Sequence, residues 1–335
     1  MSSAMVDKIA RAVLYEGYLL YPYRKSALKN RQRWNFGVLY PPAWAARQTG
    51  SDRSYFQMEC LARCGGKALV DVSLRFLHLA THAPKERRNR TGSVSDPASR
   101  VWQETTEQSV SADSLSFAVL PHLRNFSFPG AEDTDQRKLP IHGEIEISAA
   151  QVQNHVFRLT VRVRNTTDCQ TEIRDEALLH SLASAHAVLH VRDGQFISQI
   201  DPPEELRDAI DACQNVGVWP VLVGDGGNRD TMLGSPIILY DYPQVAPESQ
   251  GDLFDATEID EILSLRILTL TDQEKEEARR SDERARQILE NLEANPEHLL
   301  QLHGTVRAIS RLKKGDRVRL RPRKRADIFD TLLEG

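Results

Sequence analysis

Cysteine is scarce in this sequence, and no long hydrophobic run occurs in it. Four cysteines among 335 residues are too few for a disulfide scaffold, and they lack the paired spacing of a zinc site. No stretch of 18 apolar residues is present that could span a membrane. Charges at Asp7, Lys8 and Arg11 interrupt the apolar stretch that a signal peptide requires. These absences predict a cytoplasmic protein without membrane insertion.

The chain also lacks a large net charge, although its charges are unevenly distributed. The formal net charge is −4 and the pI about 6.2, so nucleic acid and anionic membranes are not expected as partners of the whole chain. Residues 1–240 are balanced, with 27 basic and 27 acidic side chains. Residues 241–303 carry 6 basic against 16 acidic side chains, and residues 304–335 carry 10 against 4. The pattern indicates a neutral body, an acidic segment and a basic tail.

Catalytic motifs are missing as well. The sequence contains no HExxH zinc motif, no serine nucleophile elbow and no recognisable catalytic triad. The glycine-rich run at 224–230 lacks the Lys-Ser/Thr of a phosphate-binding loop and carries two acids that would repel phosphate. We interpret it as a tight turn. We therefore expect no cofactor, and we expect that the protein is not an enzyme.

The first 173 residues have the alternation of antiparallel strands. Apolar and polar residues alternate in Tyr55–Arg63 and in Ala68–Leu79, and the intervening Gly65-Gly66 suits a two-residue hairpin turn. A second hairpin is predicted between residues 141–147 and 157–163, with acids on one strand facing arginines on the other. Three further strands are predicted, at Ala10–Tyr21, Trp34–Tyr40 and Leu115–Leu120.

Beyond residue 174 the pattern changes to short helices and strands. Helices are predicted at Asp175–Ala183 and Pro203–Cys213. Short apolar strands are predicted at His186–Val191, Val218–Val223 and Pro236–Tyr240. The succession of strand, helix and strand suggests an α/β layer attached to the antiparallel sheet.

The acidic segment is predicted to be helical, and the basic tail to begin a barrel. Thr257 with Asp260, and Thr271 with Glu274, have the spacing of N-terminal capping boxes, so two helices are expected to start there. Residues 315–322 alternate like a strand, but the roughly 20 remaining residues are too few to close a barrel with strands of about 5–6 residues.

The fold class that follows is α+β. We predict an antiparallel β-sandwich-like body with an attached α/β layer, a helical acidic segment and an incomplete C-terminal small β-barrel. The predicted divisions are a body at 1–173 with a mobile loop at 84–99, an α/β layer at 174–243, the acidic segment at 244–303 and the barrel start at 304–335.

Cysteine and histidine are poor candidates for metal ligands. On a strand, Cys60 and Cys64 lie about 13 Å apart, which is too far to chelate one zinc ion or to form a disulfide. On a helix the same spacing would bring them together. His186 and His190 fall on a predicted strand, so we expect core or surface histidines instead.

Acidic residues with interleaved aromatics form the most suggestive cluster of the sequence. One interpretation is a metal site, with the weak candidate ligands Asp225, Asp230, Asp241, Asp252 and Asp255. The other is a docking face for a basic partner. Capping and solvated charge account for part of the cluster. The candidate partner-binding residues are Tyr240, Tyr242, Glu248, Asp252, Phe254, Asp255, Glu258 and Glu261.

The basic tail offers a third interpretation, in which the protein binds RNA. Arginine and lysine at this density bind phosphate backbones with an affinity that falls steeply with salt. The candidate residues are Arg317, Arg319, Arg321, Arg323, Lys324 and Arg325.

Three long blocks of the sequence resemble a known family. Residues 10–41, 215–275 and 315–335 closely resemble a bacterial protein family encoded beside nickel–iron hydrogenase genes. The resemblance implies an accessory or maturation-linked role. It assigns no activity, no catalytic residue and no metal to this chain. It also implies further strands after residue 335, in agreement with the prediction of an incomplete barrel.

Together these observations favour a non-catalytic accessory protein that binds hydrogenase subunits or maturation proteins through Tyr240–Glu261. The alternatives are a carboxylate-based metal-binding protein or enzyme, and an RNA-binding protein that uses the basic tail. A metal site needs at least three oxygens within about 2.0–2.6 Å of one point, whereas a docking face needs them spread and exposed.

Overall fold

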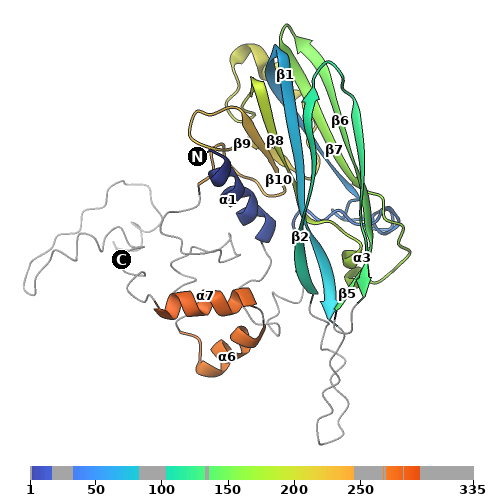
Figure 1. Cartoon of the computed structure of the whole chain (residues 1–335), viewed down its shortest axis with the longest axis vertical. Coiled ribbons are helices and arrows are strands. Elements are labelled where there is room, and N and C mark those ends of the chain that lie inside the picture. Colours follow the sequence, from blue (N-terminus) through green and yellow to red (C-terminus); the bar gives the residue numbers. More distant parts are fainter. Residues whose placement is uncertain are drawn as a thin grey trace, which may run out of the picture.

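The computed structural model describes most of the first 244 residues and two later helices. The described residues are 2–16, 33–82, 103–132, 136–244, 267, 269–281 and 283–294. They form an α+β structure dominated by antiparallel sheet, as the sequence predicts (Figure 1). No helix in this part of the chain is both long and apolar enough to cross a bilayer.

One very long strand runs through the centre of the sheet. β1 spans Tyr55–His82, 28 residues, so the hairpin predicted at Gly65-Gly66 is wrong. The β1 residues in the main core are even-numbered on both sides of the glycines, for example Cys60, Val70 and Val72, so the chain continues in the same phase instead of reversing. The glycines coincide with a register shift against the neighbouring strand, where a Cβ at Gly65 would lie 2.5 Å from Asp193.

β1 is paired along both edges, and this pairing organises the sheet. Its first half pairs with β7 (Val156–Asn165) and its second half, on the same edge, with β2 (Gln103–Ser116). The opposite edge pairs with β8 (Ala183–Phe196) and then with β5 (Gln136–Lys138). Beyond β7 the sheet continues with β6 (Ile141–Gln153) and β3 (His122–Phe128), and beyond β8 with β10 (Thr231–Ser235) and β9 (Trp219–Leu222).

The hairpin predicted at 141–163 is confirmed. β6 (Ile141–Gln153) and β7 pair antiparallel, with Glu144 opposite Arg164. The Arg164 guanidinium lies 2.6 Å from the Glu144 carboxylate and 3.3 Å from that of Glu146. β3 (His122–Phe128) pairs with the far edge of β6, and β4 (Ala131–Glu132) pairs with β5.

Three of the shorter strand predictions need correction. The segment predicted as a strand from Ala10 is helical as far as Tyr15, in α1 (Ser2–Tyr15). Its buried residues Val6, Ile9 and Val13 recur at helical spacing and pack on β9 and β10. The segment predicted as a strand at Trp34–Tyr40 is not a strand, and only its Leu39 makes isolated β-bridges. Of the strand predicted at Leu115–Leu120, only the first two residues are extended, as the end of β2 at Ser116.

The strands predicted beyond residue 174 belong to the same sheet as the body. β8 pairs antiparallel with β1, and β9 (Trp219–Leu222) and β10 (Thr231–Ser235) extend the sheet from β8. The strand predicted at Pro236–Tyr240 is wrong, because the strand in this region, β10, ends at Ser235. The predicted helices are found, as α3 (Arg174–Leu179), η2 (Glu204–Leu206) and α4 (Arg207–Asp211). A short α2 (Pro42–Ala45) precedes β1.

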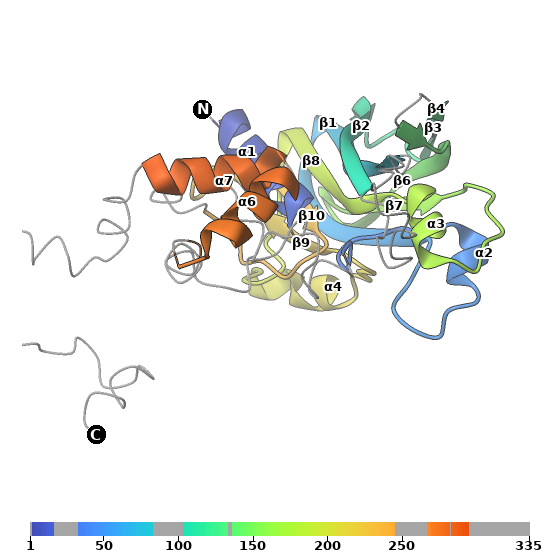
Figure 2. The same ribbon diagram turned by 90° about the horizontal axis from the view of Figure 1, so that it is seen from below.

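The second of the two predicted acidic helices has the expected cap. α6 (Asp272–Ser281) begins after Thr271, whose hydroxyl accepts a hydrogen bond from the Glu274 N–H while the Glu274 carboxylate accepts one from the Thr271 N–H. α7 (Glu283–Ala294) packs beside α6, and Lys275 of α6 lies 3.4 Å from Glu293 of α7. Both helices lie on the α1 side of the sheet (Figure 2).

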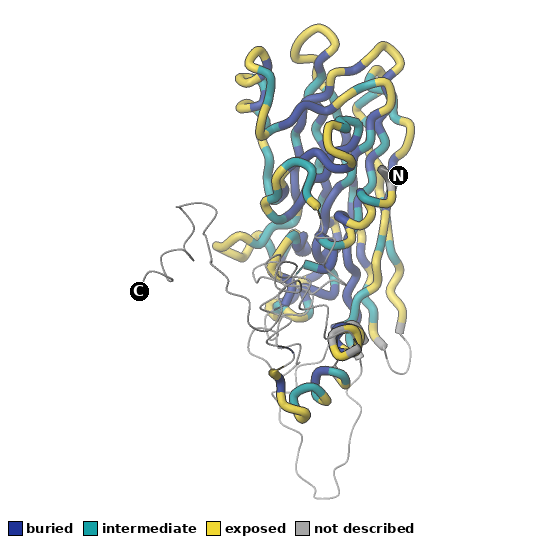
Figure 3. The backbone as a smooth tube through the Cα atoms, turned by 90° about the vertical axis from the view of Figure 1, so that its left-hand side faces the viewer, coloured by how far each residue is buried: buried dark blue, intermediate teal, exposed yellow. Residues whose placement is uncertain are grey.

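The main hydrophobic core lies along β1 (Figure 3). Inward side chains of β1 contact those of β6, β7 and β8, and the Phe76 ring on β1 lies 5.5 Å from that of Phe128 on β3. The predictions for the loop at 84–99, the helix at Thr257, and the barrel start at 304–335 fall outside the described residues.

Two histidines of the sheet are buried as neutral rings. His78 on β1 shares a hydrogen bond of 2.7 Å with the Leu139 carbonyl, and His186 on β8 shares one of 2.9 Å with the Ser184 carbonyl. The other ring nitrogen of each has no partner among the described residues. Burial, which disfavours the charged form, lowers the pKa of each from 6.5 to about 4.

We predict that the free energy of unfolding falls between pH 6.5 and pH 4. In this pH window the two histidines bind protons in the unfolded chain but stay neutral in the folded protein. Each histidine therefore lowers the free energy of unfolding by up to about 3 kcal/mol as the pH drops. Denaturant titrations of His186→Leu across this range should show a smaller decline than the wild type, by about that amount. His142→Leu, at an exposed position on β6, is the control. Equal slopes for His186→Leu and the wild type would contradict the prediction.

Candidate functional site

The structure does not gather the candidate metal ligands. The Asp241 carboxylate accepts hydrogen bonds from the Ser198 hydroxyl and from the Leu222 N–H, at 2.5 and 2.8 Å. That of Asp230 accepts one from the Thr231 hydroxyl at 2.6 Å. Asp225 lies in the turn between β9 and β10, where the predicted tight turn is found. Among the residues described, no three His, Cys, Asp or Glu side chains are placed to hold a metal. Asp252 and Asp255 lie outside them.

Cys60 and Cys64 lie four residues apart on one strand, as predicted. Both thiols are buried on the core side of β1. Burial raises the pKa of Cys64 to about 12 and that of Cys60 well above its usual value. Both are therefore protonated at neutral pH, which is unsuitable for a thiolate ligand or nucleophile.

The candidate docking residues are only partly described. Tyr240 is 81% exposed, whereas Tyr242 packs partly against the core and donates its N–H to the Leu222 carbonyl at 2.7 Å. The remaining candidates for partner or nucleic-acid binding fall outside the described residues: Glu248, Asp252, Phe254, Asp255, Glu258, Glu261, Arg317, Arg319, Arg321, Arg323, Lys324 and Arg325.

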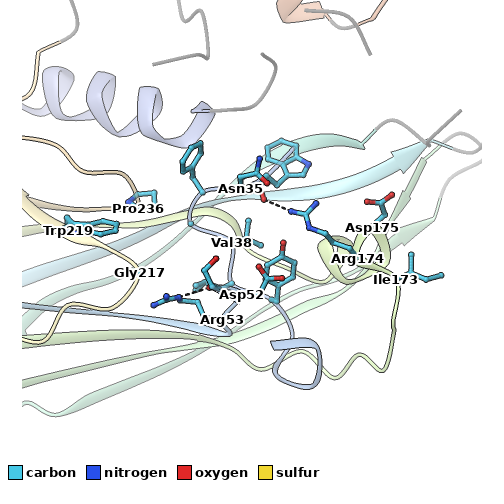
Figure 4. A pocket seen from close by; sticks show the side chains of 16 residues that line it. Asn35, Val38, Asp52, Arg53, Ile173, Arg174, Asp175, Gly217, Trp219 and Pro236 are labelled. Atoms are coloured by element: carbon cyan, nitrogen blue, oxygen red, sulfur yellow. Dashed lines mark hydrogen bonds between the residues drawn. The ribbon is translucent and has the colours of Figure 1, made fainter. Parts of the chain in front are cut away.

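A groove of about 650 Å³ lies where segments far apart in the sequence meet (Figure 4). Its lining comes from residues 34–40 and 51–53 before β1, 173–175 at the start of α3, 217–219 at the start of β9, and Pro236 after β10. Arg53, Gly217 and Trp219 lie at one end, and Ile173, Arg174 and Asp175 at the other. No local motif marks this site, because each segment contributes only one to seven residues.

A buried asparagine holds the groove segment that contains Leu39. The Asn165 amide at the end of β7 donates to the carbonyls of Leu39 and His180, at 2.9 and 2.8 Å. Its side-chain oxygen accepts the Thr167 N–H at 2.9 Å, and its own N–H donates to the Ser54 carbonyl. Since Asn165 is only 1% exposed, these bonds hold four chain segments together without competition from water.

The backbone of the groove takes conformations that few residues adopt. Gly37 and Gly217 have positive φ of 57° and 74°, and Trp34, a bulky residue, has 62°. A Cβ at Gly37 would lie 2.7 Å from that of Pro236, so only glycine permits this contact. Backbone strain of this kind is concentrated at functional sites, where the surrounding structure enforces it.

Most polar groups of the groove are already bonded within the protein. The Arg174 guanidinium donates to the carbonyls of Arg33 and Trp34, the latter at 3.0 Å, and lies over the Tyr40 ring. The Asp52 carboxylate accepts the Trp44 indole N–H at 3.1 Å. Burial raises the pKa of Tyr40, so its phenol stays protonated. Among the described residues that line the groove, this arrangement provides no activated nucleophile or base.

Large hydrophobic side chains are exposed around the groove. Trp219 is 44% exposed at one end and Ile173 63% at the other, and Phe36 on the wall is 39% exposed. Ile238 and Tyr240, at 74% and 81%, follow Pro236 in the chain. Exposed apolar and aromatic side chains around a concave, partly polar centre are typical of a binding surface.

The chain matches no known family profile, and no curated protein is similar to it at a significant level.

We predict that Asn165→Ala destabilises the fold by about 3 kcal/mol. The substitution removes the Asn165 donor from the His180 carbonyl and the acceptor from the Thr167 N–H, and it leaves the Leu39 carbonyl with the Leu182 N–H alone. An unsatisfied buried group costs about 1–3 kcal/mol. Urea denaturation followed by circular dichroism measures the loss. Asn125→Ala, at an exposed position on β3, provides the control and should change stability by less than about 0.5 kcal/mol. Similar values for both variants would refute the role of Asn165.

Proposed function

We propose that this protein is a non-catalytic accessory protein of a nickel–iron hydrogenase system, and that it acts in the cytoplasm by binding a subunit or maturation protein. The exposed aromatic and aliphatic side chains around the groove are the observation that carries the proposal. Interface energy is concentrated in such residues, above all tryptophan and tyrosine. The hydrogenase context comes from the resemblance of three sequence blocks to proteins encoded beside hydrogenase genes.

The proposed docking surface extends the segment inferred from the sequence. Tyr240 belongs to both, and it follows the groove residue Pro236 by four positions. The Asp241 carboxylate is bonded to Ser198 and to β9, so the chain around Tyr240 is tied to the sheet. A preordered surface lowers the entropic cost of binding.

The finer architecture is part of the proposal. We propose that the β-rich part is a sandwich-like body, because β1 is paired with β7 along one half and with β2 along the other while one core cluster contacts all three strands. We keep the proposal that residues 304–335 begin a small barrel. The carboxylate-based metal or enzyme function is less well supported, because Asp230 and Asp241 are already bonded within the fold.

We predict that Trp219→Ala combined with Tyr240→Ala weakens partner capture at least tenfold. Truncating two exposed aromatics removes the groups expected to contribute about 2 kcal/mol or more each to binding. The measurement is affinity purification of the tagged full chain from a hydrogenase-expressing host, with quantitative mass spectrometry of hydrogenase components. The matched control is Val119→Ala with Leu123→Ala, two exposed apolar residues near β3.

Other outcomes would replace the proposal. Hydrogenase components that are recovered equally with both double variants would exclude the groove as the docking surface. Stoichiometric metal in the purified protein, lost on Asp252→Ala, would favour the metal-binding alternative. Co-purified RNA whose binding falls steeply with salt would favour the basic tail.

A further inference from the structure

Arg53 carries a charge that the described part of the chain leaves unpaired. Its Nε donates to the Ser51 carbonyl at 3.2 Å, and it makes no ion pair with any described carboxylate. No described residue accepts a hydrogen bond from its two terminal amino groups, and Arg53 lines the groove (Figure 4). Arg174, at the opposite end of the groove, differs because its guanidinium is bonded to two backbone carbonyls.

The position of Arg53 is fixed by its surroundings. The Arg53 carbonyl accepts a hydrogen bond from the Tyr40 N–H at 2.9 Å, and Arg53 forms an isolated β-bridge with Leu39. A Cβ at Gly217 would lie 3.1 Å from the Arg53 Cδ, so the arginine stem runs close across the backbone of Gly217. Trp219 lies at the same end of the groove. A cation and a half-exposed indole thus lie at the same end of the groove.

Charge and size indicate what kind of group Arg53 would bind. A guanidinium presents paired donors that match the two oxygens of a carboxylate. Asp52 and Asp175 line the same groove and would repel a doubly charged phosphate more strongly than a singly charged carboxylate. The groove holds about 650 Å³ and reaches from Arg53 to Asp175, which is much more than one anion fills.

We propose that the groove binds an extended peptide segment of the partner, in which a carboxylate pairs with Arg53 and a neighbouring apolar side chain packs on Trp219. This inference rests on the proposed function, since it names the chemistry that the accessory protein recognises in its partner. Arg53 fixes the register of the segment, and the exposed hydrophobic side chains supply contact area.

A phage-displayed library of random heptapeptides, selected on the immobilised full chain, tests this inference. Wild-type protein should enrich peptides with Asp or Glu at one position beside an aromatic or aliphatic residue. A synthetic peptide of the enriched sequence should bind Arg53→Gln at least tenfold more weakly than the wild type, as expected for loss of a charge-assisted hydrogen-bonded pair. Selection on Arg53→Glu should replace the acid by Lys or Arg.

Two further variants keep the test decisive. Arg63→Gln makes the same substitution at an exposed arginine of β1 outside the groove and should bind the peptide like the wild type. Arg53→Lys keeps the charge but loses the paired geometry, and should weaken binding several-fold even if Arg53→Gln unfolds. Enrichment without acids on the wild-type protein, or equal affinity for Arg53→Gln and the wild type, would overturn the inference.

The two proposals fail in distinguishable ways. If Arg53→Gln retains the hydrogenase components that the Trp219 and Tyr240 variant loses, docking at the surface stands and the carboxylate pairing is wrong. If no hydrogenase component is captured but peptides still depend on Arg53, the peptide site stands and the hydrogenase role is wrong.

Discussion

The pairing of β1 along both of its edges is the constraint on which the rest of the structure depends. A strand of 28 residues rises through the whole sheet, and its two halves have different neighbours on the edge shared by β7 and β2. Each neighbour carries its own side chains to the same core, so the alternation of β1 sets the register of the other strands. The groove lies at the start of β1, where the segments that cover the core converge.

The sequence predicts the parts of this fold that depend on local pattern. The β6–β7 hairpin is specified by apolar alternation and by opposite charges across the strands, and the cap of α6 by the spacing of Thr271 and Glu274. The error at Gly65-Gly66 could have been avoided. A two-residue hairpin places residues 62 and 69 opposite each other, on the same face of the sheet. The β1 residues of the main core are even-numbered from Phe56 to Phe76, which a straight strand permits and that hairpin does not.

The candidate site could not be predicted in the same way. The residues that line the groove come from five segments between residues 34 and 236, and only the tertiary fold brings these segments together. Asn165 has no unusual neighbours in the sequence, and its role depends on the carbonyls of Leu39 and His180, which only the fold brings within reach. The acids that looked suggestive, such as Asp241, instead hold the chain against β9. Composition reveals how many polar groups a chain has, but only the fold reveals which are already bonded.

This difference between bonded and unbonded polar groups also bears on the binding role proposed for the groove. Catalysis needs a reactive group whose pKa is tuned near the working pH, whereas burial here keeps the Tyr40 phenol protonated and Arg174 is fixed by carbonyls. Only glycine fits at residue 37, because Pro236 occupies the space that any side chain would need. A groove wall with exposed aromatics, and with Arg53 among its lining residues, can select a shape and a charge without changing a covalent bond.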